Sequence, residues 1–122
     1  KNIRKALVKL QREYVNQFLI SHAGVVIDGR DIGTIVFPNA DFKFYLDADI
    51  KIRAERRTQE LIHLNYEVIY LDVLNDLICR DERDKNRIEG PLIIAKDAFY
   101  IDTGNKSEEF VLHKALKFIK SF

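Results

Sequence analysis

The sequence has 122 residues, of which 47% are hydrophobic and 32% are charged, and its net charge is +1. This composition predicts one globular domain with a hydrophobic core rather than a disordered chain. The near-neutral charge argues against a general binder of nucleic acids or anionic membranes, because such proteins carry a basic excess. No apolar run reaches about 18 residues, so no membrane span is expected. The single cysteine, Cys79, excludes an internal disulfide and is typical of the reducing cytoplasm.

The first part of the chain predicts a helix followed by a strand. Residues 2–21 are expected to form a long amphipathic helix that stops before Gly24. Its apolar residues recur at helical spacing, at Ile3, Leu7, Leu10, Tyr14 and Phe18. The short apolar run 25–27 predicts a strand that is buried on both faces.

The rest of the chain alternates between strands and helices. The expected elements are a strand at 42–46, a helix at 48–64, a helix at 70–87, a strand at 98–101 and a last helix that Ser107 caps. The inner stripe of the last helix is predicted to be Val111, Ala115, Leu116 and Ile119. This order indicates an α/β protein with a parallel sheet and helical crossovers. Ligands bind beyond the carboxyl ends of such strands, which is where residues 28–31 are expected.

The residues after the first predicted strand read DGRD, from Asp28 to Asp31. Arg30 offers a planar fork of donors that suits a phosphate or a carboxylate. Asp31 accepts hydrogen bonds when ionised, so it suits an amine or a guanidinium. An ordinary surface turn with a local Asp–Arg pair explains the same residues equally well, since short motifs also match by chance.

Two further clusters are rich in arginine. On the helix 70–87, Arg80, Asp84 and Arg87 share one face, and Arg83 lies beside Arg87. They form either an arginine face that grips phosphate or a solvated helix end with salt bridges, and composition favours the second. The segment IRAERRTQEL carries Arg53, Arg56 and Arg57. These arginines form either a solvated face, with Glu60 as a partner, or a mobile arm that carries positive charge to a phosphate chain.

Four segments, in order and at matching spacing, resemble the bacterial cytidylate kinase family. They are GRDIGTIVFPNADFKFYLDAD, RAERR, RDERDKNRIEGPL and DAFYIDTGNKS. The resemblance implies a three-layer P-loop nucleoside monophosphate kinase fold that transfers the terminal phosphoryl group of ATP to CMP or dCMP. It also implies a cytoplasmic enzyme, monomeric when intact, with CMP or dCMP and ATP as small-molecule partners, Mg²⁺ as cofactor, and no nucleic-acid or membrane partner.

The resemblance implies a base pocket made by Asp31, Arg4 and Arg87. Asp31 matches the family's acidic residue that accepts from the exocyclic amine of cytosine. Arg4 and Arg87 match arginines that complete the pocket. A carboxylate at this point favours cytosine over uracil, because uracil has a carbonyl acceptor where cytosine has the amine donor.

The resemblance also implies a phosphate site and a lid. Arg30 and Arg80 match residues that hold the monophosphate, and Asp84 matches a carboxylate near the sugar hydroxyls. A lid over the ATP phosphates is expected at about 53–68, and its arginines would be Arg53, Arg56 and Arg57. The catalytic set that follows is Arg30, Arg80, Arg56 and Arg57.

The sequence departs from the family at its start. It contains no phosphate-loop motif G-x-x-x-x-G-K-S/T, and it does not begin with Met. Residues 1–122 are therefore expected to be the C-terminal part of one kinase domain, inactive alone, with Mg²⁺ held mainly through ATP and the missing loop. The family's first strand lies between 25–27 and 42–46, so an incomplete sheet with unpaired inner edges and low stability is expected. In the segment IDTGNKS, Lys106 stands where the family usually has an apolar residue. This segment lies close to the ATP side in the family, so the adenine contacts of the family are not expected in full here.

Other functions are compatible with the same residues. The chain is either part of an active kinase, a catalytically inactive nucleotide-binding remnant, or a non-functional remnant of a broken gene. A kinase that prefers uridylate is a weaker alternative, and Asp31 argues against it. The three histidines are scattered without the spacing of metal ligands, so no metal site is predicted within the chain.

Overall fold

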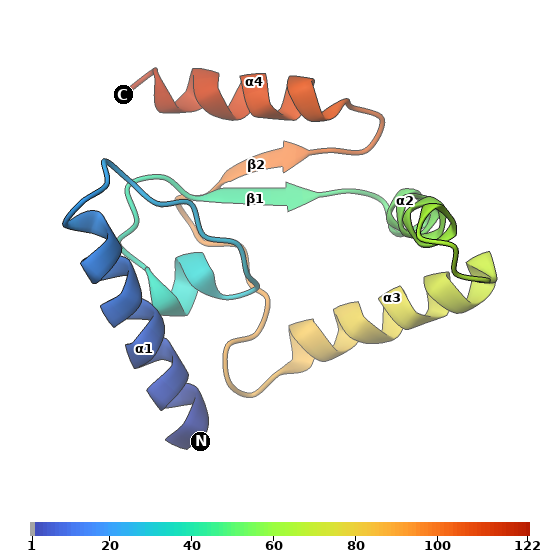
Figure 1. Cartoon of the computed structure of the whole chain (residues 1–122), viewed down its shortest axis with the longest axis horizontal. Helices are drawn as coiled ribbons and strands as arrows, with labels where there is room; N and C mark the ends of the chain where they lie inside the picture. Colours follow the sequence, from blue (N-terminus) through green and yellow to red (C-terminus); the bar gives the residue numbers. More distant parts are fainter. Residues whose placement is uncertain (1) are drawn as a thin grey trace.

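The structure, a computed structural model, describes residues 2–122. Its elements are helix α1 (Asn2–Leu19), the short π-helix η1 (Ile32–Val36), strand β1 (Phe44–Asp47), helices α2 (Ile50–His63) and α3 (Tyr70–Asn86), strand β2 (Phe99–Asp102) and helix α4 (Glu108–Ile119). The two strands lie side by side, α4 runs along them, and α2 lies beyond their carboxyl ends (Figure 1).

The predicted helices and the last two predicted strands are present, and the predicted ends differ from the observed ones by at most two residues. Capping explains two of the helix starts. Ser107 accepts a hydrogen bond from the backbone N–H of Phe110 at 3.2 Å, and Asp49 accepts one from Lys51 at 2.8 Å. These bonds satisfy donors that the first turn of a helix leaves free, so local sequence sets where α2 and α4 begin.

The sheet is parallel, as predicted, and pairs Phe44 with Phe99 at one end and Asp47 with Asp102 at the other. Successive side chains point to opposite faces of a strand. On the α4 face, Phe99 stacks on Phe118 with ring centroids 4.2 Å apart. On the other face, Tyr45 and Tyr100 stack at 6.0 Å. The sheet therefore has one face covered by α4 and one tyrosine-bearing face.

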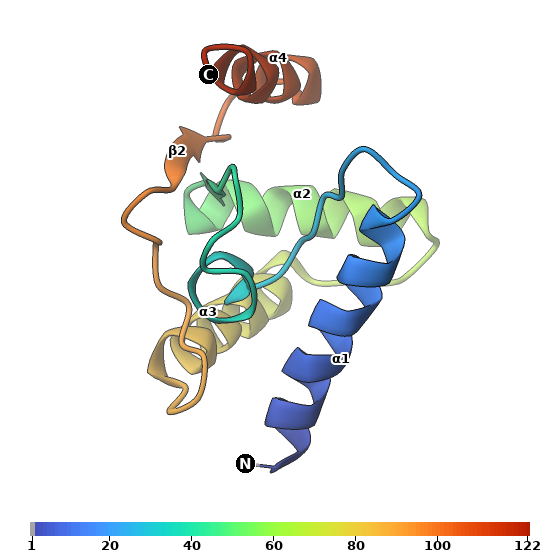
Figure 2. The same ribbon diagram turned by 90° about the vertical axis from the view of Figure 1, so that its left-hand side faces the viewer.

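The predicted strand at 25–27 is wrong. Residues 24–29 have no regular secondary structure, and Val26 is fully exposed. A strand needs a partner for its N–H and C=O groups, and within residues 2–122 no backbone hydrogen bond reaches 25–27. β1 has only β2 as a neighbour in this part of the chain, as expected for an unpaired inner edge. The extended segment passes between α1 and η1, on the side of β1 away from β2 (Figure 2).

The inner stripes predicted for the first and last helices are only partly correct. In α1, Ile3 and Leu10 are exposed, whereas Val15 is buried. Arg12 fastens α1 to η1 by donating to the carbonyls of Val36 and Ile35, both at 2.8 Å. In α4, Leu116 and Ile119 are also exposed, and Phe118 makes the aromatic contacts with the sheet. These helices have more apolar surface than the described elements cover.

The hydrophobic core is small for a chain of this composition. Its buried apolar residues are Val15, Val36, Ala48, Ala54, Val73 and Ile101. α2 and α3 form a separate packed pair, with Ala54 and Val73 between them. None of the helices described is long and apolar enough to span a membrane.

Candidate functional site

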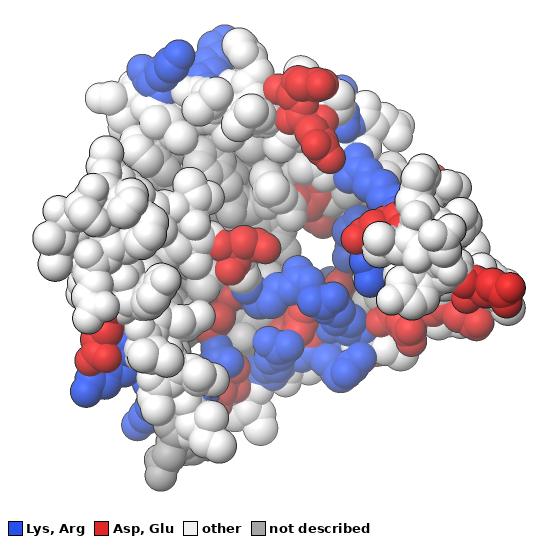
Figure 3. Space-filling model, viewed as in Figure 1, with Lys and Arg blue, Asp and Glu red and all other residues white. Residues whose placement is uncertain are grey.

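Lysine and arginine side chains gather over α3, next to a hollow in the middle of one face of the molecule (Figure 3). The residues come from four places: α1, the segment that leads into η1, α3 and the loop after α3. Carboxylates from the same elements lie among them. Each arginine of this site lies close to an acidic side chain or to a backbone carbonyl, or borders a cavity.

The first pair joins Arg4 of α1 to Asp31, which immediately precedes η1. Their side chains are 32% and 14% exposed, so the carboxylate is the better buried partner. Gly90, in the loop after α3, covers this pair with a left-handed φ of +68°. A Cβ at Gly90 would collide with both charged groups, so this close approach requires glycine. Two of the three residues predicted for the base pocket thus lie together.

The second group centres on Asp84 of α3, which is 1% exposed. Its Oδ2 lies 3.2 Å from Nε of Arg30, and its Oδ1 pairs with Arg87. The arginine of DGRD is thus held by the carboxylate of the α3 cluster, although more than 50 residues separate them in the chain. Asp84 is thus the shared partner of two arginines from different parts of the chain. A contact between Asp84 and a sugar, which the resemblance implied, would need this group to open.

A cavity of about 390 Å³ lies beside this group and is lined by Arg80, Arg83, Asp84 and Arg87. The residues are three and four positions apart on α3, so they share one face of the helix, as the sequence predicted. The backbone N–H of Leu92 donates to the carbonyl of Asp84 at 2.8 Å, which folds the following loop back onto the helix end. The arginine face therefore borders a concave site.

Arg53 does not belong to this cavity. It forms a two-pronged pair with Asp81 of α3, at 3.1 Å and 2.6 Å, and its Nε donates to the carbonyl of Ala48 at 3.0 Å. This hydrogen bonding lowers the pKa of Asp81 and raises the pKa of Arg53. The guanidinium thus ties the start of α2 to the end of β1 and to α3.

The other two arginines of α2 point elsewhere. Arg56 donates to the carbonyl of Thr103 at 2.6 Å and to that of Gly104, in the loop after β2. Arg57 is about half exposed and pairs with Glu60 at 2.7 Å, as expected for a solvated helix face. The structure does not bring the three predicted lid arginines together, because each is bound to a different partner.

Three residues at the site escaped the sequence analysis: Asp81, Gly90 and Tyr45. Asp81 lies inside the cluster CRDERDKNR, but spacing alone gave no reason to separate it from surface charges. Tyr45 faces the site from β1, and burial, followed by the charges of Asp47 and Asp81, raises its pKa. Within residues 2–122, no group of three or more His, Cys, Asp or Glu side chains is placed to hold a metal ion.

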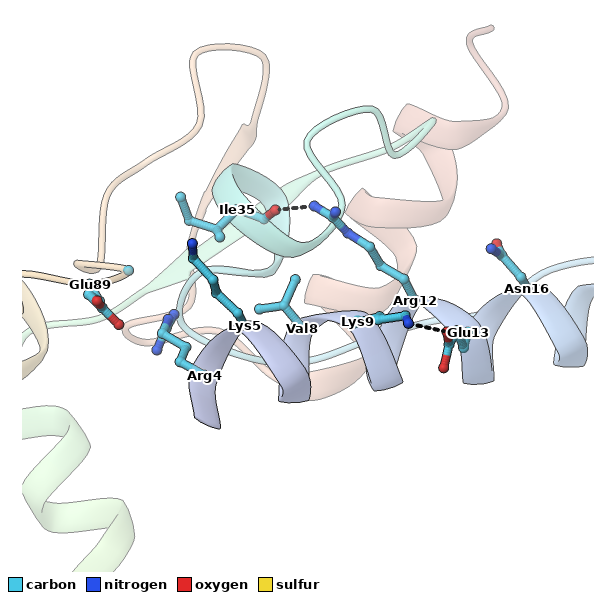
Figure 4. Close-up of a pocket in the computed structure, with 10 residues that line it drawn as sticks. Arg4, Lys5, Val8, Lys9, Arg12, Glu13, Asn16, Ile35 and Glu89 are labelled. Carbon is cyan, nitrogen blue, oxygen red and sulfur yellow. Dashed lines mark hydrogen bonds and ion pairs between the residues drawn. The ribbon is translucent and has the colours of Figure 1, made fainter. Parts of the chain in front are cut away.

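A second cavity of about 450 Å³ runs along α1 (Figure 4). Most of its basic side chains already have partners. Arg12 donates to η1, Lys9 lies 3.6 Å from Glu13, and Arg4 holds Asp31. The groove therefore reflects how α1 is fastened to η1.

The sequence of the chain matches a known protein family. The family model described as cytidylate kinase matches residues 1–121. A cytidylate kinase of Thermosipho melanesiensis is 42% identical over 118 residues, 97% of this chain and 52% of that protein. Cytidylate kinases of Shewanella putrefaciens and Bartonella tribocorum are 44% and 45% identical over 117 residues, 96% of this chain and 49% and 53% of those proteins. The chain thus spans about half the length of the curated relatives it matches, and it belongs to the cytidylate kinase family.

Proposed function

We propose that residues 1–122 form the acceptor-nucleotide part of a single kinase domain, including a lid at about 53–68. The whole enzyme would transfer the terminal phosphoryl group of ATP to CMP or dCMP. Membership of the family supports the reaction class. The observation that carries the proposal for this chain is the pairing of Arg4 with Asp31 beside the arginine cavity of α3.

The proposed base pocket rests on the chemistry of that pair. Cytosine has an amine donor next to a ring-nitrogen acceptor, and in uracil donor and acceptor are exchanged. Asp31 would accept from the amine, while Arg4 would donate to the neighbouring acceptor, with Arg87 completing the pocket. Uracil would leave the largely buried carboxylate facing another acceptor, which is the kind of mismatch that discriminates strongly.

The proposed phosphate site lies beside the base pocket. Arg30 and Arg80 would neutralise the monophosphate and align its oxygen for in-line attack on ATP. Phosphoryl transfer asks a protein mainly for positioning and for stabilisation of spread negative charge. The pairing of Arg30 with Asp84 supports this role, because it fixes the guanidinium before any ligand arrives.

The chain offers fewer free side chains for the proposed ATP site than for the proposed CMP site. Arg56 and Arg57 are the proposed contacts to the ATP phosphates, and Arg56 would first leave its carbonyl partners. Arg53 is fully engaged at the base of α2. The described residues do not offer a magnesium site, and Mg²⁺ would be held through ATP and the part of the enzyme outside this chain.

Calorimetric titration of the chain with CMP, and with UMP as the comparison, tests the proposal. We expect CMP to bind at least about tenfold more tightly than UMP, equivalent to roughly 1.4 kcal/mol. In the variant Asp31→Asn the carboxylate is lost and the preference should disappear. Equal binding of the two nucleotides by the unchanged chain would contradict the proposed base pocket.

The alternative is a catalytically inactive nucleotide-binding protein. The lack of a phosphate-loop motif in this chain favours it. A coupled assay with ATP, Mg²⁺ and CMP separates the two. CDP formation that begins only when a phosphate-loop segment is added supports the first proposal. CMP binding with no CDP formation even after that addition supports the alternative.

A further inference from the structure

The hydrogen-bonding groups of the Arg4–Asp31 pair suit adenine as well as cytosine. Both bases carry an exocyclic amine next to a ring nitrogen that accepts hydrogen bonds. A carboxylate that accepts from the amine and a guanidinium that donates to the ring nitrogen therefore match either base. Asp31 can distinguish cytosine from uracil in this way, but a second feature has to distinguish cytosine from a purine.

The loop at residues 88–91 lies directly against this pair. Gly90 is buried, and a Cβ at this position would overlap a terminal nitrogen of Arg4 and an oxygen of Asp31. The backbone at Gly90 is therefore in van der Waals contact with both side chains. The space beside the Asp31 carboxylate is thus already occupied by main chain.

Both ends of the loop are tied to Asp84. Arg87, which precedes the loop, pairs with the Asp84 carboxylate, and the backbone N–H of Leu92, which follows it, donates to the Asp84 carbonyl at 2.8 Å. Between these ties, Ile88 is 99% exposed, so this apolar side chain does not anchor the loop. Pro91 restricts the backbone further, because its ring fixes φ. The two ties and the proline hold the loop against the proposed base pocket.

The position of the loop matters most for the second ring of a purine. In adenine this ring is fused to the carbon beside the amine-bearing carbon, so it occupies space next to the amine. Cytosine has only a C–H group there. With its amine bonded to Asp31, adenine would bring its second ring toward the main chain at Gly90, whereas cytosine would leave that space free.

We propose that the loop 88–91, through Gly90, excludes purine bases from the acceptor-nucleotide site. The inference rests on the proposed function, because it takes Asp31 and Arg4 to be the residues that bind the base. Gly90 would be a specificity-determining residue that acts by occupying volume, whereas Asp31 would select by hydrogen bonding. Two different neighbours of the base would thus reject its two kinds of competitor.

Calorimetric titrations of the full 122-residue chain with CMP, AMP and UMP test the inference. The variant Pro91→Gly frees the backbone of the loop and leaves Gly90 in place. The other proline of the chain provides the matched control, Pro38→Gly, in the turn before β1. Glycine at this position keeps the carbonyl that accepts a hydrogen bond from Lys43. Circular dichroism checks that each variant keeps its helices.

We expect the unchanged chain to bind CMP at least about tenfold more tightly than AMP. Pro91→Gly should reduce this ratio at least about threefold, because the loop is no longer held in place, and the preference for CMP over UMP should stay. Pro38→Gly should change the ratio less than about twofold. The inference is overturned if AMP binds the unchanged chain as tightly as CMP, if Pro91→Gly leaves the ratio unchanged, or if Pro38→Gly reduces it as much.

NMR with isotope-labelled glycine gives an independent readout of contact with the base. The chain has only five glycines, so their amide signals can be followed one by one. CMP should shift the amide signal of Gly90 and leave that of Gly24 in place, because the surroundings of Gly24 are open. Binding of CMP without a shift at Gly90 would also overturn the inference.

The titration with UMP separates this inference from the proposed function. If CMP is preferred over UMP but AMP binds like CMP, the base pocket stands and only the exclusion of purines by the loop fails. If CMP and UMP bind equally while AMP is rejected and Pro91→Gly admits it, the role of Asp31 is wrong and the exclusion by the loop stands. Absence of CMP binding to the unchanged chain contradicts both.

Discussion

At the scale of single residues, Asp84 shows how a buried charge organises the site. A carboxylate that is 1% exposed needs compensation, and two guanidiniums provide it. Those guanidiniums are 42% and 45% exposed, so water still solvates them in part. The group therefore costs less to break than a fully buried pair would.

We expect Asp84→Asn to lower the free energy of unfolding by roughly 2 kcal/mol, because Arg30 and Arg87 lose their shared charge partner. Urea denaturation measures the change. The control is Asp76→Asn, an exposed carboxylate earlier on α3, which should have an effect within about 0.5 kcal/mol. Equal effects of the two variants would mean that burial of Asp84 contributes no stability.

Gly90 gives a second prediction at this scale. Gly90→Ala should lower the free energy of unfolding by about 1–2 kcal/mol, because alanine is strained at positive φ. It should also weaken CMP binding, since the added methyl group meets the Arg4–Asp31 pair. Gly24→Ala is the matched control, because a Cβ at Gly24 has no atom within 4 Å. If both alanine variants bind CMP alike, Gly90 does not shape the pocket.

At the scale of elements, the N-terminal half of α2 is bound to two neighbouring segments. Arg53 ties it to α3 through Asp81, and Arg56 ties it to the loop after β2. If α2 closes over ATP as a lid, Arg56 has to break its hydrogen bond to the carbonyl of Thr103. The pair of Arg53 with Asp81 would still hold the start of α2 against α3. Two arginines three positions apart on one helix thus bind different elements.

The Arg53–Asp81 pair predicts a dependence of stability on pH. The folded protein lowers the pKa of Asp81 below its unfolded value, chiefly through the hydrogen bonds from Arg53. Its stabilising contribution is then complete above the unfolded pKa of about 4 and is lost as the pH falls through the lower folded value. Urea midpoints between neutral pH and the acid range should fall less steeply in Asp81→Asn than in the unchanged chain. Some dependence of stability on pH should remain in both proteins, because the hydrogen bond from Lys43 also lowers the pKa of Asp97.

At the scale of the whole molecule, much apolar surface has no cover within the described residues. β1 has one strand neighbour, Val26 is fully exposed, and Leu7 and Leu10 of α1 are more than half exposed. Unpaired strand edges and apolar patches promote association between chains. The relatives are about twice as long, which is consistent with a fold that this chain only partly builds.

We therefore expect the isolated chain to melt with low cooperativity and to associate as its concentration rises. Val26→Lys should reduce association, measured by light scattering, because a charge beside the open edge of β1 opposes strand pairing. Leu112→Lys makes a similar change at an exposed position of helix α4, which has no open strand edge of its own, and should have a smaller effect. A sharp, concentration-independent melt at high temperature would show that the chain is a complete folding unit.

Features that depend only on neighbours along the chain could be predicted from the amino-acid sequence. Local preference explains the cap that Ser107 forms at the start of α4. Helical periodicity explains why one face of α3 carries Arg80, Asp84 and Arg87. The same two effects predict the order of strands and helices. These effects act between residues that are close in the chain, so they can be predicted from the amino-acid sequence.

The tertiary structure alone decided which groups meet. Spacing could not show that Arg30 pairs with Asp84, that Asp81 engages Arg53, or that 25–27 does not form a strand. Ion pairs and strand pairing depend on partners that the fold brings from elsewhere in the chain. A strand with no partner leaves its hydrogen-bonding groups to water, whatever its sequence favours.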